Sequence, residues 1–190
     1  MKIEVIFVDE YEGLHSIHFP SEEVCEYSRL FDLWSDREYL LNYCKKNSDY
    51  IFNEYWRFSR LEEFIEMIVE EADKLLDMFE YYAENGFSPG SNELQKIFLP
   101  LENKFRTVPV LQESKAKAET NKGKLRLYAL RVDQNTFVLT GGCIKLTHRM
   151  DQHEDTIREL EKMSEVSNFL KETEIYNQDN LACYYEQSEY

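Results

Sequence analysis

The stretch that decides the fold is KLRLYALRVDQNTFVLTGGCIKLTHR, residues Lys124–Arg149. It holds two runs rich in β-branched and aromatic residues, Leu125–Val132 and Thr136–Lys145, which are separated by the polar segment Asp133-Gln134-Asn135. Two such runs joined by a short Asp/Asn turn are typical of a β-hairpin. The sequence therefore predicts a pair of adjacent strands at the centre of the fold.

The alternation of side chains along a strand divides the first run into two faces. Arg126, Tyr128 and Leu130 are expected on one face, and Leu125, Leu127, Ala129 and Arg131 on the other. The second run contains Gly141-Gly142. Paired glycines inside a strand indicate a β-bulge or the close approach of another backbone.

The same stretch concentrates positive charge in an acidic chain. The chain has 22 Lys/Arg and 37 Asp/Glu, a formal net charge of −15, yet residues 101–150 hold ten Lys/Arg against four Asp/Glu. A strongly acidic protein is normally a poor ligand for nucleic acid, because phosphates must be met by Lys and Arg. A basic segment can nevertheless create a local positive surface. Two interpretations stay open: a phosphate-binding surface, or cations that pair with the chain's own acidic helices.

The first part of the chain is expected to form a hairpin and then helices. Lys2–Val8 and Leu14–Phe19 predict two short strands, the second ended by Pro20. Ser21 is expected to cap a helix. The sequence Ser35-Asp36-Arg37-Glu38 has the form of a capping box and predicts the start of another helix.

The longest predicted helix lies between a capping box at Ser59–Glu62 and a stop at Asn85-Gly86. Apolar residues recur in it at three- and four-residue steps. The opposite face is acidic and is expected to be solvated, or else to contact a basic surface such as the one in this chain. Its residues are Glu62, Glu63, Glu66, Glu70, Glu71, Asp73, Asp77 and Glu80.

The segments that flank the central hairpin give further expectations. Phe105–Leu111 predicts an edge strand because it contains Pro109. The polar, Lys-rich segment Ser114–Gly123 predicts a mobile loop, and Asn177–Tyr190 lacks periodicity and predicts a flexible tail. A helix is expected from about Asp151. Its apolar face is predicted to hold Ile157, Leu160, Met163, Ser167 and Leu170.

The length of 190 residues favours a single domain with one core. We expect residues 1–176 to form one α+β domain, with a hairpin at 1–20, a helical segment at 21–84, strands at 103–147 and a helix at 152–171; residues 177–190 form the tail. No apolar window is long enough to span a membrane, and the N-terminus lacks the pattern of a secretory signal. The four cysteines are scattered, which is ordinary for a cytoplasmic protein. No metal or cofactor motif occurs, so we expect no cofactor.

The order of these elements resembles the RelE/HigB-like toxins, particularly the phage-derived HigB branch. Members typically have an Arg-led apolar strand, a tight turn, and a strand that closes on a Gly-aromatic-x-Lys-Lys-Thr run. Here Arg126, Leu127 and Leu130 correspond to the Arg-led strand, and Gly142–Thr147 corresponds to the closing run. Leu146 replaces the second Lys and Cys143 the aromatic residue, and the N-terminal half is larger than in ordinary members. The resemblance covers Lys124 to about Leu170.

The resemblance implies an α+β domain with a mainly antiparallel sheet flanked by helices. To this RelE-like arrangement the chain would add an N-terminal hairpin and an acidic helical segment. Family members commonly cut mRNA on the ribosome without a metal and are neutralised by a cognate antitoxin. The partners it implies are ribosome-bound mRNA and a helix-turn-helix antitoxin.

Cleavage of RNA by attack of its 2′-hydroxyl requires a base, an acid, and cations for the developing phosphorane charge. The candidate catalytic residues are Arg126, Lys145 and His148, the last because imidazole exchanges protons near neutral pH. The candidate residues for binding RNA or a partner are Lys124, Tyr128, Arg131 and Arg149. Tyr128 is expected to stack on a base. The alternative is a non-catalytic module whose basic hairpin binds a protein partner or the chain's own acidic helices.

Overall fold

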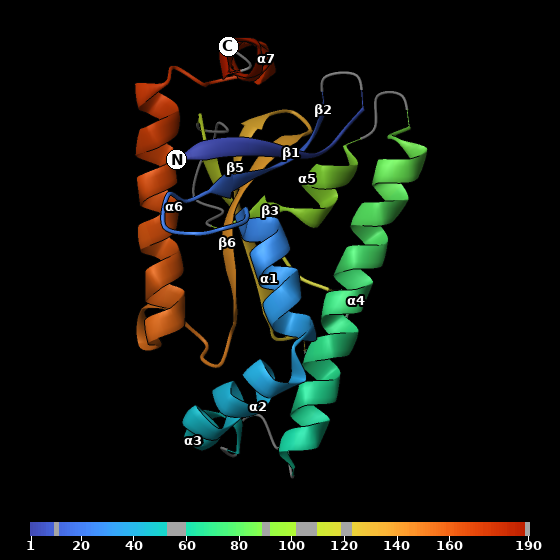
Figure 1. Cartoon of the computed structure of the whole chain (residues 1–190), viewed down its shortest axis with the longest axis vertical. Helices are drawn as coiled ribbons and strands as arrows, with labels where there is room; N and C mark the ends of the chain where they lie inside the picture. Colours follow the sequence, from blue (N-terminus) through green and yellow to red (C-terminus); the bar gives the residue numbers. More distant parts are fainter. Residues whose placement is uncertain (10–11, 53–59, 89–91, 102–109, 119–122, 189–190) are drawn as a thin grey trace.

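The computed structural model describes residues 1–9, 12–52, 60–88, 92–101, 110–118 and 123–188. It is an α+β fold in which a six-stranded mixed sheet is flanked by helices (Figure 1). The strand order is β1-β2-β6-β5-β4-β3. The strands are β1 (Lys2–Asp9), β2 (Glu12–His18), β3 (Leu99–Pro100), β4 (Gln112–Ala116), β5 (Leu125–Asp133) and β6 (Thr136–Ile144).

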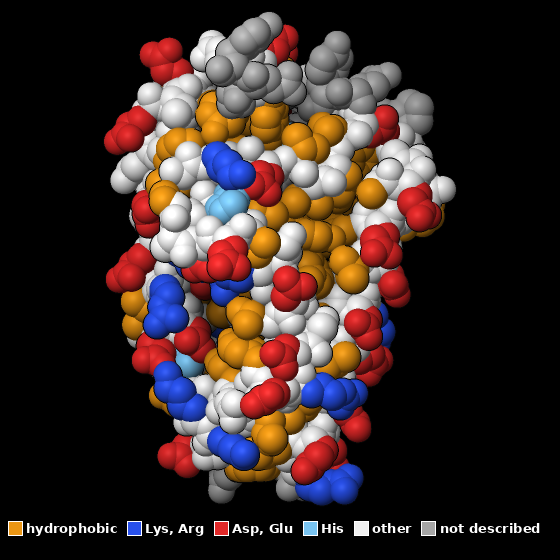
Figure 2. All heavy atoms as spheres, viewed as in Figure 1, with side chains coloured by type: hydrophobic (Ala, Val, Ile, Leu, Met, Phe, Trp, Pro, Cys, Tyr) orange, Lys and Arg blue, Asp and Glu red, His pale blue; other side chains and the backbone are white. Residues whose placement is uncertain are grey.

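Helices cover both faces of the sheet. The long helix α4 and the shorter α1 lie on one side of the sheet, and α6 lies on the other (Figure 1). Asp and Glu side chains line the outer sides of the molecule over α4 and α6 (Figure 2). The helices are α1 (Glu26–Ser35), α2 (Arg37–Lys46), α3 (Ser48–Ile51), α4 (Leu61–Asn85), α5 (Glu93–Ile97), the 3-10 turn η1 (Met150–Gln152), α6 (Glu154–Glu172) and α7 (Gln178–Ser188).

The central hairpin is confirmed as antiparallel strands β5 and β6. The predicted faces of β5 are confirmed where its side chains are buried. Leu125, Leu127 and Ala129 join the larger core under α1 and α4, whereas Leu130 packs with residues of α6. The alternation of apolar residues therefore sufficed to orient this strand.

The glycine pair in β6 does mark an irregularity. Tyr128 pairs with Gly141 and Ala129 with Leu139, so Thr140 is the extra residue of a bulge. A Cβ atom added to Gly142 would lie 2.7 Å from the Arg126 carbonyl oxygen. The glycine is needed there because the two backbones approach too closely for a side chain.

The N-terminal hairpin is confirmed, and it joins the central strands by a parallel pairing. β1 and β2 are antiparallel, whereas β2 and β6 are parallel, with Gly13–Ser16 aligned to Thr136–Leu139. β6 is thus paired on both sides over its first half. Beyond Leu139, β5 is its only partner among the described strands, so one edge of the second half of β6 is not covered by a described strand.

Two predicted helix starts are displaced, the first by several residues and the second by one. α1 begins at Glu26 rather than after Ser21, because the chain after Pro20 first makes a turn in which the Glu22 amide donates to the Phe19 carbonyl at 3.1 Å. The cap of α2 is Asp36 rather than Ser35. Its carboxylate accepts the amides of the second and third residues of the helix at 2.8 and 3.1 Å.

The acidic face of α4 is not solvated throughout. Glu71 is only 1% exposed, and its Oε2 accepts the backbone amides of Lys124 at 2.7 Å and Leu125 at 2.8 Å. The carboxylate therefore binds the start of β5, where β4 offers no partner. The predicted stop at Gly86 is confirmed by its φ of 66°. The predicted cap at Ser59 lies outside the described residues.

The segment predicted as a mobile Lys-rich loop begins as a strand. Ser114–Ala116 belongs to β4, and Ala116 and Ala118 are buried in the core. Small residues at alternate positions fit closely against the sheet, a pattern that the charged lysines between them concealed. Most of the predicted strand Phe105–Leu111 lies outside the described residues. Its last residue, Leu111, is in a turn with a φ of 56°.

The predicted buried face of α6 is confirmed at Met163 and Leu170, but at the other positions the buried residue is the one before the predicted residue. Ile157 is 41% exposed, while the neighbouring Thr156 is buried and donates from its hydroxyl to the Met150 and His153 carbonyls at 2.6 and 2.9 Å. Polar side chains at inward positions thus hid the periodicity. The buried residues are Thr156, Glu159, Met163, Val166 and Leu170.

The C-terminal segment predicted as a flexible tail forms α7 in the structure. Leu181 is buried in the core that α6 makes with the sheet. The Tyr185 hydroxyl lies 2.8 Å from Nδ1 of the buried His15 on β2. A few contacts, rather than a periodic apolar face, dock this helix.

We expect Glu71→Ala to lower the free energy of unfolding by about 1.5–3 kcal/mol, because it removes the charged acceptor of two backbone amides at the start of β5. Urea unfolding at neutral pH measures the change. Glu66→Ala, on the exposed face of the same helix, is the matched control. Equal effects of the two substitutions would show that the Glu71 contact does not stabilise the fold.

Candidate functional site

Two of the predicted cations, Arg126 and Lys145, lie close together on the α6 face of the sheet, beside a third cation, Lys115. Lys115 pairs opposite Tyr128, and Arg126 opposite Cys143, so their side chains share the face of those partners. Lys145 follows Cys143 by two residues, and its amide continues the ladder by donating to the Lys124 carbonyl at 2.7 Å. We call Lys115, Arg126 and Lys145 the basic patch.

The members of the basic patch repel one another. Partial burial lowers the pKa of Lys145, and the charges of Arg126 and Lys115 lower it further. The pKa of Lys115 is lowered by burial, then by Arg126 and Lys117. Within the described part of the chain, none of the three makes an ion pair with a carboxylate. The acidic helices therefore do not neutralise these cations.

The Arg126 guanidinium is held at the edge of the patch. Its Nη1 donates to the carbonyls of Gly123 at 3.1 Å and Leu125 at 2.6 Å. These bonds use one nitrogen and keep the side chain close to the backbone. The other guanidinium nitrogens make no hydrogen bond to a described residue, so they can bind an anion.

Most of the other predicted site residues do not join the patch. Tyr128 is 1% exposed and packs with Cys143 and Met163, so its ring cannot stack on a base in this conformation. Lys124 is also buried. Arg131 lies at the far end of β5, where its Nε donates to the Asp133 carbonyl at 3.0 Å.

The remaining two lie on the segment after β6. His148 and Arg149 are exposed, and the Arg149 Nη2 is 2.6 Å from Asp151 Oδ2. An arginine already paired in this way is a weaker candidate for binding phosphate. The structure thus groups Arg126 and Lys145 from the predicted set and adds Lys115, which the sequence analysis had placed in a loop.

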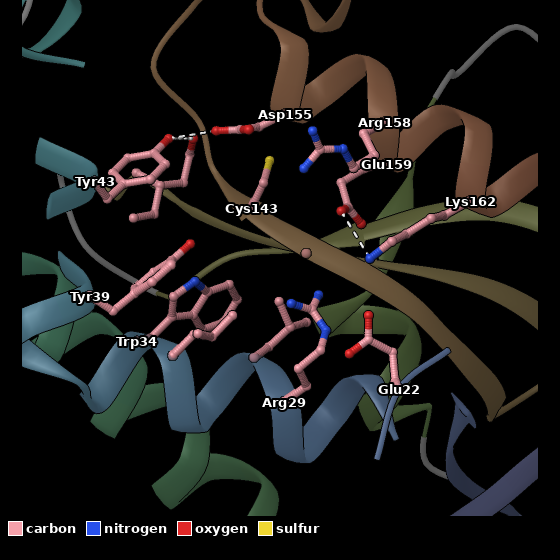
Figure 3. Close-up of a pocket in the computed structure, with 14 residues that line it drawn as sticks. Glu22, Arg29, Trp34, Tyr39, Tyr43, Cys143, Asp155, Arg158, Glu159 and Lys162 are labelled. Atoms are coloured by element: carbon pink, nitrogen blue, oxygen red, sulfur yellow. Dashed lines mark hydrogen bonds and ion pairs between the residues drawn. The ribbon is translucent and has the colours of Figure 1, made fainter. Parts of the chain in front are cut away.

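A second site lies at the uncovered edge of β6. A cavity of about 190 Å³ opens between α1, α2, α6 and the second half of β6 (Figure 3). Aromatic rings gather on one side of it, with Asp155 beside Tyr43, and Glu159 and Lys162 lie on the other side (Figure 3). Its aromatic residues are Trp34, Tyr39 and Tyr43, and its charged residues are Glu22, Arg29, Asp155, Arg158, Glu159 and Lys162.

A group of four ionisable side chains borders this cavity, and its two carboxyl groups are buried. Glu26, 1% exposed, accepts two hydrogen bonds from Arg29, at 2.7 and 2.8 Å, and one from Lys162 at 2.8 Å. Burial alone raises the pKa of Glu26, but hydrogen bonds and charges from Arg29 and Lys162 outweigh it, so the pKa is lowered. Glu26 is therefore the ionised carboxylate of the group.

Glu159 is the fourth member and behaves differently. It is 4% exposed, and burial raises its pKa to about 7; Lys162 opposes the shift and Glu26 adds to it. Lys162 lies 3.4 Å from Glu159 but 2.8 Å from Glu26, so Glu26 is its main partner. Oε2 of Glu159 has no hydrogen-bond partner among the described residues. A Cβ atom at Gly141 would collide with this oxygen, so the glycine makes room for the carboxyl group.

Only one part of this cavity has a signal in the sequence. The glycine pair indicated a close approach to β6, but Glu26 and Lys162 lie far apart in the chain and their pairing has no local pattern. Glu159 had the appearance of an ordinary helical acid. In the described ranges, no group of three or more His, Cys, Asp or Glu side chains is arranged to hold a metal ion.

No family model matches the chain, and comparisons with curated proteins and with solved structures also find no match. The resemblance to RelE/HigB-like toxins therefore stays a prediction. Among the helices of the described residues, none has both the length and the apolar character needed to cross a membrane.

We expect Glu159→Gln to make the protein more stable than the wild type at pH 8. The folded-state pKa of about 7 exceeds the ordinary value of 4.5, so the native state holds a proton that the unfolded state has lost. Wild-type stability then falls as pH rises from about 4.5 to 7. The loss is on the order of 3 kcal/mol.

Urea unfolding at pH 5, 6, 7 and 8 measures this difference. Glu165→Gln, on the exposed face of α6, is the control and should keep the wild-type pH dependence. If Glu159→Gln also keeps that dependence, Glu159 does not take up its proton on folding.

Proposed function

We propose that this protein is a toxin-like ribonuclease of a toxin–antitoxin system, which binds the phosphates of ribosome-bound mRNA at the basic patch and cuts the chain there. One observation carries the proposal: three cations share a surface and have no carboxylate partner among the described residues. Burial and the charge of Arg126 lower the pKa of both Lys115 and Lys145. In a chain of net charge −15, such a surface favours an anion as its ligand.

The residue types suit the chemistry of phosphodiester cleavage. The 2′-hydroxyl attacks the adjacent phosphorus, its proton passes to a base, and the 5′-oxygen leaves with a proton from an acid. Arg126 can bind the non-bridging oxygens and stabilise the added negative charge of the phosphorane. Lys145, with its lowered pKa, is a better proton donor than an ordinary lysine. His148 lies three residues further along an exposed segment and is the candidate base.

The alternative is a non-catalytic protein that binds an acidic partner, such as an antitoxin, on the same hairpin. One contact within the chain favours it. The acidic helix α4 already places the Glu71 carboxylate on the backbone amides at the start of β5, so the hairpin can accept carboxylate groups from a helix. In this alternative an acidic segment of the partner occupies the patch, and RNA is not cut.

We expect Lys145→Gln to weaken RNA binding several-fold at about 100 mM salt and to reduce the slope of log K against log salt by about one, because one phosphate contact is lost. Fluorescence anisotropy with a labelled single-stranded RNA measures both quantities. Lys171→Gln removes the same charge near the other end of α6 and should leave the slope unchanged. Equal slopes for wild type and Lys145→Gln would exclude this lysine from the RNA contact.

Expression of the protein is expected to arrest growth and to produce cuts in mRNA on ribosomes. Arg126→Ala and Lys145→Ala should each relieve the arrest, because both remove charge stabilisation at the reacting phosphate. Sequencing of the 5′ ends of ribosome-bound mRNA locates the cuts, and Lys171→Ala should retain them. RNA binding without cleavage, or arrest that persists in both patch variants, would contradict the ribonuclease proposal.

A further inference from the structure

The cavity beside β6 presents a backbone peptide group as well as side chains. The Ile144 carbonyl accepts a hydrogen bond from the Tyr43 hydroxyl at 3.3 Å, which shows that it points away from β5. Peptide groups alternate in direction along an antiparallel strand, so Gly142 points the same way. Gly142 has no side chain and lines the cavity, so it must do so with its backbone. β2 does not reach this far, so no described strand pairs with the Gly142 amide and carbonyl on this side, and both can bond a ligand.

The charges around the cavity are largely neutralised. Arg29 and Lys162 both bind Glu26, and Asp155 accepts the Tyr43 hydroxyl at 2.8 Å. Arg158, the third cation of the lining, makes no ion pair with a described residue. The three cations are nevertheless matched by the carboxylates of Glu22, Asp155 and Glu26, so the cavity does not present the excess of positive charge that an anion would require. The Glu159 carboxyl remains, with Oε2 directed at Gly141 and without a hydrogen-bond partner among the described residues.

The volume of the cavity and the residues that line it restrict the kind of ligand that can bind there. The volume of about 190 Å³ corresponds to about six water molecules at about 30 Å³ each, which is room for one small ring system rather than a peptide or a lipid. Trp34 and Tyr39 lie together on one side, opposite Glu159 (Figure 3). Aromatic rings bind flat ligands by stacking or edge contacts.

We propose that this cavity binds an uncharged planar ring with adjacent hydrogen-bond donors and acceptors, a ligand of the nucleobase class. The Gly142 amide and carbonyl match the acceptor and donor of such a ring, and the Glu159 carboxyl supplies the next contact along its edge. The aromatic side chains hold its apolar faces. The proposal does not depend on RNA binding at the basic patch, because the cavity and the patch share no side chain.

The test is a titration of the full chain with free nucleosides, followed by calorimetry and by the amide resonances of ¹⁵N-labelled protein. At least one of cytidine, uridine, adenosine and guanosine should bind saturably and shift the Gly142 amide, while ribose should not. Glu159→Leu is expected to weaken binding at least tenfold, the loss of about one hydrogen bond. Glu165→Leu, on the exposed side of α6, should bind like the wild type.

A second variant keeps the test decisive if Glu159→Leu does not fold. Tyr39→Leu changes a side chain that is only partly buried, and loss of its ring should weaken binding at least fivefold. The proposal is overturned if no nucleoside shifts the Gly142 amide, or if orthophosphate produces the same shift, which would make this an anion site. It is also overturned if Glu165→Leu loses as much affinity as the folded cavity variants.

Discussion

The structure depends on the pairing of β6 with two strands that are far apart in sequence. β2 binds one edge of β6 in parallel, and β5 binds the other in antiparallel fashion. All nine residues of β6 are buried. Two parallel neighbours cannot be joined by a tight turn, so the intervening chain must cross over a face of the sheet. That crossover carries α1 and α4, and it leaves the other face for α6.

The same pairing creates the cavity, because β2 leaves β6 at Leu139 and the bulge at Thr140 follows directly. The sheet edge then opens between helices on both faces. Buried charges border this opening, and they are tolerated because Glu26 is bonded to both Arg29 and Lys162. Glu159 shares only the second of these cations. An incompletely satisfied carboxyl beside an uncovered strand edge is typical of a binding site rather than of a stabilising core.

The sequence predicted the local features of the fold and missed those that depend on distant partners. The central hairpin and its bulge follow from alternation, turn residues and glycines, all of which act over a few positions. The parallel β2–β6 pairing joins segments more than 100 residues apart and leaves no such pattern. The sequence predicts a solvated face for Glu71 and does not distinguish Glu159 from other helical acids, because a buried carboxylate is recognised only through its partners. The sequence predicts a loop at Lys115, because small residues alternate with lysines from Ser114 to Ala118.

Whether a chain of net charge −15 can bind RNA depends on the distance between its carboxylates and the bound phosphate. At physiological salt, charges are screened over about 8 Å, so a phosphate responds mainly to the groups nearest to it. The basic patch lies on the α6 face of the sheet, while the acidic helix α4 packs against the opposite face (Figure 1). The sheet thus separates most carboxylates of α4, though not those of α6, from an anion at the patch. The net charge still opposes the long-range approach of RNA, so delivery by the ribosome would matter more than free diffusion.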